Sequence, residues 1–80
     1  MSLRILVRPD QIKAWLAERN GIPARRRGTD TDMCVLFGET SADYQPITVD
    51  ELLEAMKFHH LVVVVDQEPG KTFHRIYQHS

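Results

Sequence analysis

Hydrophobic and polar residues alternate over the first positions of the chain. Leu3, Ile5 and Val7 share one side of an extended backbone, which predicts a short strand. Arg4 and Arg8 interrupt it and indicate a strand at a sheet edge. A helix is expected next, because Ile12, Trp15 and Leu16 are spaced three and four residues apart and form one apolar face. The aliphatic stem of Arg19 extends this face.

The limits of this helix are marked by its flanking residues. Pro9 suits the first helical position, and Asn20-Gly21 is a typical stop because both residues tolerate the left-handed conformation. The polar residues 24–32 after Pro23 predict a loop, as does the composition of residues 39–46. Between them, residues 33–37 (Met-Cys-Val-Leu-Phe) are continuously apolar, which predicts a strand covered on both faces.

A capping box marks the start of a second helix at Thr48. Its hydroxyl is placed to accept a hydrogen bond from the Glu51 amide, while the Glu51 carboxylate accepts one from the Thr48 amide. The apolar, β-branched residues 61–65 then predict a central strand. Residues 68–71 (Glu-Pro-Gly-Lys) predict a type II turn, and the alternating residues 72–78 predict a strand that returns antiparallel.

The order strand, helix, strand, helix, strand, strand predicts a single α+β domain over residues 1–80. We expect a two-layer arrangement, with both helices on one face of a three- or four-stranded, mostly antiparallel sheet. The expected core combines apolar residues from these elements: Trp15, Leu16, Val35, Phe37, Leu52, Leu53, Met56, Val62 and Val64.

Length and charge limit the possible functions. A chain of 80 residues buries only about 60% of its unfolded surface, so an added interface would stabilise it. Ten Lys and Arg against eleven Asp and Glu give a net charge of −1, which argues against a dedicated nucleic-acid binder. The single cysteine, Cys34, favours a reducing cytoplasm. The longest apolar run, residues 61–65, is far shorter than the ~20 residues that cross a bilayer, so no membrane partner is expected.

Three segments of the chain resemble a family of short bacterial proteins. They are residues 12–25 (Ile-Lys-Ala-Trp-Leu-Ala-Glu-Arg-Asn-Gly-Ile-Pro-Ala-Arg), Gly28-Thr29 and residues 47–53 (Ile-Thr-Val-Asp-Glu-Leu-Leu). The chain differs in having Asn20 where a second glycine is usual and Val49 where tryptophan is usual. Members often carry the automatic label "1,4-alpha-glucan branching enzyme". Branching enzymes are built on barrels of about 250 residues, which this chain cannot close. The resemblance therefore implies a recurrent small fold and supplies no activity.

The candidate binding site is the basic run Arg25, Arg26 and Arg27, since guanidinium groups bind phosphates bidentately. The competing interpretation is a solvated loop whose arginines pair with Asp30, Asp32 and glutamates of the second helix. Cys34 stands among apolar residues and is expected to be a buried hydrophobe rather than a nucleophile. The four histidines lack the paired spacing of a zinc site. We expect no catalytic residue, metal or cofactor.

Three functions follow as hypotheses. The first is a non-catalytic domain that binds another macromolecule or a second copy of itself, as a homodimer. The second is nucleic-acid or anion binding through Arg25, Arg26 and Arg27, which requires these arginines to be clustered, unpaired and beside an exposed aromatic such as Tyr44. The third is an accessory subunit of a carbohydrate-related enzyme, which requires a concave pocket with several titratable groups of shifted pKa.

Overall fold

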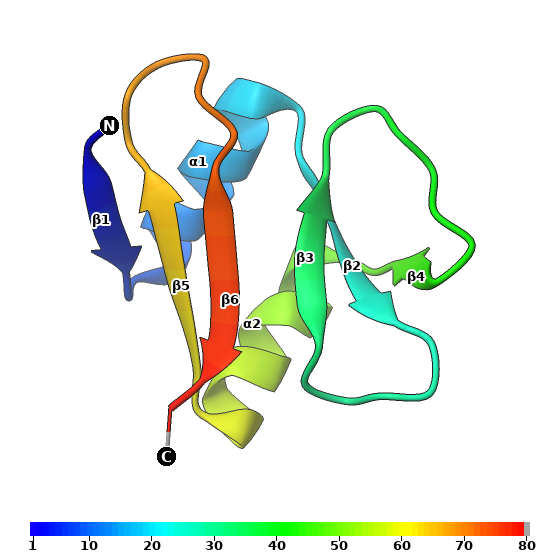
Figure 1. Cartoon of the computed structure of the whole chain (residues 1–80). Coiled ribbons are helices and arrows are strands. Elements are labelled where there is room, and N and C mark those ends of the chain that lie inside the picture. The colour runs from blue at the N-terminus through cyan, green and yellow to red at the C-terminus, as the bar shows by residue number, and fades with distance from the viewer. Residues whose placement is uncertain (80) are drawn as a thin grey trace.

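Two helices and six short strands make up the computed structural model, which describes residues 1–79 (Figure 1). The α+β class expected from the sequence is confirmed. In chain order, the elements are β1 (Leu3–Leu6), α1 (Pro9–Arg19), β2 (Ile22–Arg26), β3 (Met33–Leu36), β4 (Tyr44–Pro46), α2 (Val49–His59), β5 (Leu61–Asp66) and β6 (His74–Gln78).

The strands form two antiparallel sheets rather than the single sheet of three or four strands that the pattern indicated. Their orders are β1-β5-β6 and β3-β2-β4. β6 and β3 run side by side where the sheets meet (Figure 1). At this seam the Val35 amide donates to Nε2 of His74 over 2.9 Å. The imidazole nitrogen thus takes the place of the backbone carbonyl that would accept this bond in one continuous sheet.

Two segments expected as loops contain strands. β2 lies between β3 and β4 and includes Arg25 and Arg26, and β4 lies within the segment 39–46. The polar composition of residues 24–32 concealed β2, because neighbouring strands satisfy its backbone without an apolar alternation. Pro23 lies just beyond the last β2–β4 pair, Ala24 with Pro46. Its carbonyl still accepts from the Ile47 amide over 2.9 Å, but proline has no N–H to return a second bond.

Both helices begin where the sequence indicated, and α1 also ends there. Pro9 opens α1, and Asn20 closes it in the left-handed conformation with φ of 53°. Gly21 does not adopt the left-handed conformation expected of it, since its φ is not positive. Lack of space favours glycine there instead, because a Cβ would lie 2.7 Å from Cγ1 of Val35. The capping box of α2 is present, with both hydrogen bonds between Thr48 and Glu51. Neither of these helices is long and apolar enough to cross a bilayer, among the residues described.

The core lies between the helices and the inner faces of the sheets. α2 contacts β5 of one sheet and β2 of the other, and so holds the two sheets together. In β5, the buried apolar residues are Leu61, Val63 and Val65. The expectation that Val62 and Val64 belong to the core is therefore wrong, since they lie on the opposite face. The fully buried side chains of largest volume are Ile12, Leu52 and Val65.

Candidate interaction surface

One face of the β1-β5-β6 sheet carries no helix. Figure 1 looks onto this sheet with both helices behind it. Because side chains alternate along a strand, the residues out of phase with Leu61, Val63 and Val65 point away from the helices. We call these residues the open face: Leu3, Ile5, Val62, Val64, Phe73, Arg75 and Tyr77.

The open face is apolar and accessible. The exposed fractions are 52% for Leu3, 54% for Ile5, 46% for Phe73 and 41% for Tyr77. The strand register aligns Ile5 with Val64 and Arg75 across the sheet, and Val62 with Tyr77 in the next row. Contiguous exposed apolar residues of this kind mark contact sites for other proteins more often than isolated exposed side chains do.

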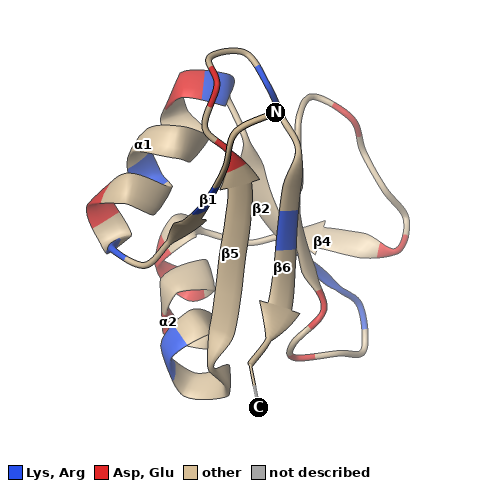
Figure 2. Cartoon of the chain, turned by 60° about the vertical axis from the view of Figure 1, so that its left-hand side comes forward, with Lys and Arg blue, Asp and Glu red and all other residues tan. Residues whose placement is uncertain are grey.

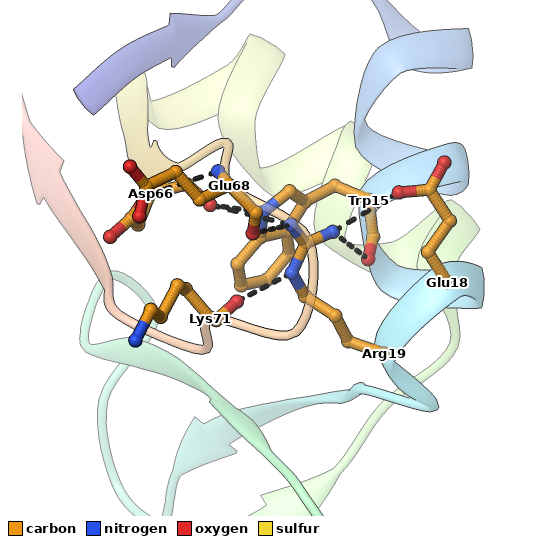
Figure 3. A network of polar contacts seen from close by, with 6 residues as sticks. All are labelled: Trp15, Glu18, Arg19, Asp66, Glu68 and Lys71. Atoms are coloured by element: carbon orange, nitrogen blue, oxygen red, sulfur yellow. Dashed lines mark hydrogen bonds and ion pairs between the residues drawn. The ribbon is translucent and has the colours of Figure 1, made fainter. Parts of the chain in front are cut away.

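A buried arginine network supports one end of this sheet from behind (Figure 3). The Arg19 side chain is only 3% exposed, and its guanidinium lies 4.6 Å from the centre of the Trp15 ring. It donates to the carbonyl oxygens of Glu68, at 2.8 Å, and Lys71, while Trp15 Nε1 donates to the Asp66 carbonyl at 2.9 Å. The network thereby fixes the β5–β6 loop to the end of α1.

The sequence indicated only an apolar role for the stem of Arg19. Besides Trp15 and Glu18 of its own helix, the guanidinium binds backbone carbonyls about fifty residues further along the chain. No local pattern identifies these distant partners. The Asp66 carboxylate extends the network, because it accepts from the amides of Ser2 and Glu68. The start of β1 is thus also attached to this loop.

The three arginines of the basic run do not form one cluster. Arg25 and Arg26 are adjacent on β2 and point to opposite faces, while Arg27 lies in the following turn. Arg26 pairs with Asp32 at 3.5 Å, and Arg27 Nε donates to the Ala42 carbonyl at 3.1 Å. In Figure 2 the basic positions are scattered over both helices, several strands and the loops.

A shallow pocket of about 210 Å³ lies on the outer side of the β3-β2-β4 sheet, below the loop after β3. Arg27, Glu39 and Tyr44 line it together with apolar residues. The Tyr44 hydroxyl donates to Asp32 over 3.0 Å. Burial, this hydrogen bond and the Asp32 charge raise the pKa of Tyr44. Its phenol is thus held in the neutral form and already engaged, which gives the pocket no evident acid–base pair.

The lone thiol and the histidines are not arranged as a reactive or metal-binding site among the described residues. Cys34 is half-buried on β3, and burial, followed by the charges of Asp32 and Glu39, raises the pKa of its thiol. A raised pKa opposes formation of the reactive thiolate. His74 lies at the seam between the sheets. Within residues 1–79, no three potential metal-ligating side chains come together.

Comparison of the chain with protein-family models, with curated proteins and with solved structures finds no match. The resemblance to the family of short bacterial proteins stays a prediction.

Proposed function

We propose that this domain is a non-catalytic protein-interaction module that binds through the open face of the β1-β5-β6 sheet. The observation that supports the proposal is the row of accessible apolar side chains on a sheet face that neither helix covers. Burying a large apolar side chain contributes about 1.5–3 kcal/mol, so the remaining exposed area of four such residues is a substantial source of binding free energy.

The residue types on the open face also favour a protein partner. Tyr77, Phe73 and Arg75 are of the types enriched at protein interfaces, where aromatic rings and guanidinium groups contribute much of the binding energy. We rank this function above anion binding through Arg25, Arg26 and Arg27, because Arg26 and Arg27 are already engaged within the chain.

Position-specific photocrosslinking tests the proposal. A photoreactive phenylalanine analogue replaces Tyr77 on the open face or, as a control, Phe58, which is 80% exposed on α2. We expect crosslinks to a defined protein from position 77 and not from position 58, and Val64→Lys should abolish them. Equal crosslinking from both positions, or none from position 77, would contradict the proposal.

A further inference from the structure

The outer edge of β1 is a free strand edge beside the open face. Among the described residues β1 pairs only with β5, and it is the outermost strand of its sheet in Figure 1. The Gln67 amide donates to the Ser2 carbonyl over 2.8 Å, which fixes the direction of the backbone groups. Ser2, Arg4 and Leu6 therefore bond toward β5, whereas the N–H and C=O groups of Leu3 and Ile5 point outward.

We propose that a second copy of this chain adds to this edge, antiparallel to β1, around a twofold axis at Ile5. The inference rests on the proposed interaction function and names the partner as a second copy. Leu3 and Ile5 supply the outward backbone groups, and their side chains lie on the open face. The pairing joins two three-stranded sheets into one of six strands and makes their open faces continuous.

The charge of Arg4 selects the register. An axis at Arg4 would place two arginines directly opposite each other, about 4.5 Å apart between Cα atoms, and like charges there are unfavourable. An axis at Ile5 instead sets Arg4 opposite Leu6 of the second copy, Ile5 opposite Ile5, and Leu3 opposite Val7. The pairs on either side of Arg4, Ile5 with Ile5 and Leu3 with Val7, are then apolar.

A groove lies beside β1, on the helix side of the proposed seam. This groove of about 400 Å³ is lined by Leu6 and Val7 on one side and by Leu53, Glu54 and Lys57 of α2 on the other. In the proposed dimer, Arg4 of the second copy arrives next to Leu6 and therefore beside this groove. The Glu54 carboxylate attracts its guanidinium, while Lys57 repels it. The two residues thus provide variants with opposite expected effects.

Disulfide trapping tests the register in a Cys34→Ser background, which removes the only native thiol. With the axis at Ile5, the Cα atoms of the two residues 5 lie about 5.5 Å apart, inside the range of about 4.4–6.8 Å that a disulfide spans. Leu3→Cys is the matched control, since Leu3 is as exposed as Ile5 but its symmetry mate lies about 14 Å away along the strands. We expect Ile5→Cys to form a covalent dimer in a thiol–disulfide buffer and Leu3→Cys to remain monomeric.

Two trapping results would overturn this register. Equal crosslinking of both variants would show random collisions. A preferred crosslink between Leu3→Cys and Ile5→Cys chains would place the axis at Arg4.

Sedimentation equilibrium of the native chain tests the association without crosslinking. We expect reversible dimers, weakened about tenfold or more by Ile5→Lys, which puts two like charges directly opposite each other. Ile22→Lys is the matched control, because Ile22 is an isoleucine 49% exposed on β2, and it should leave association unchanged. Glu54→Gln should weaken the dimer and Lys57→Gln should strengthen it.

A chain that stays monomeric at every concentration would overturn the dimer, as would equal effects of Ile5→Lys and Ile22→Lys. Crosslinks from position 77 to a different protein would still support the proposed function.

Discussion

The guanidinium of Arg19 lies over the indole of Trp15, and the two side chains together bind three carbonyl oxygens of the β5–β6 connection: those of Asp66, Glu68 and Lys71. Arg19 is four residues after Trp15, so one turn of α1 presents both donors on the same side. This pair couples the end of α1 to the sheet that carries the open face.

Arg19→Ala should destabilise the domain by about 1–3 kcal/mol, because it removes the donor of the half-buried Glu68 carbonyl and the contact with the Trp15 ring. Arg19→Lys should give a smaller loss, since one ammonium keeps the charge but cannot reproduce the planar fork. Urea unfolding followed by Trp15 fluorescence measures both. An unchanged midpoint for Arg19→Ala would mean that water replaces the guanidinium without cost.

Gly21→Ala should destabilise by about 1–3 kcal/mol through overpacking. The added Cβ would lie 2.7 Å from Cγ1 of Val35 and 3.1 Å from both Leu16 and Phe37, so the α1–β3 contact has to open. The double variant Gly21→Ala/Val35→Ala should lose less stability than the sum of its two single variants. Additive losses in thermal unfolding would show that Gly21 does not act through Val35.

His74→Ala should expose the Val35 amide, whose acceptor in the seam is Nε2 of this imidazole. We expect a loss of about 1–3 kcal/mol and faster hydrogen exchange at the Val35 amide. His74→Gln is the comparison, because its side-chain oxygen can accept the same bond. Slow exchange at Val35 in the alanine variant would show that the seam does not depend on the imidazole.

Thr48→Ala should cost about 1 kcal/mol, because it removes the acceptor of the Glu51 amide at the start of α2. Glu51→Gln should be nearly neutral, since glutamine serves equally in a capping box. The unfolding midpoints of the two variants decide the point. Equal losses would indicate that the charge of Glu51, rather than the hydrogen-bond pair, stabilises this helix end.

Tyr44 should titrate above its ordinary pKa of 10.0, because burial and the contact with Asp32 both raise the pKa of its phenol. The folded chain holds the phenolic proton more tightly than the unfolded chain, so its contribution to stability is complete below pH 10.0 and is lost as the pH rises through the folded pKa. Phenolate absorbance in a Tyr77→Phe background isolates Tyr44, since the chain has two tyrosines. Asp32→Ala should bring the pKa of Tyr44 closer to 10.0, and an unchanged value would leave burial as the whole cause.

Local signals in the sequence determined both helices and the final hairpin. Pro9 and Asn20 bound α1, and Thr48 with Glu51 starts α2, because capping depends on residues only a few positions apart. The turn at Gly70 also follows from its own residues, with φ of 78° and a hydrogen bond from the Lys71 amide to the Glu68 carbonyl at 3.2 Å.

Tertiary structure decided the remaining features. β2 forms because β3 and β4 pair with both its edges, a long-range arrangement that its own residues do not signal. In β5 the sequence is apolar on both faces, so alternation does not distinguish Val63 in the core from Val64 on the open face. The side on which the helices pack makes that distinction. The open face exists because both helices cover the same side of one sheet. The edge of β1 is free because β5 is its one partner among the described residues.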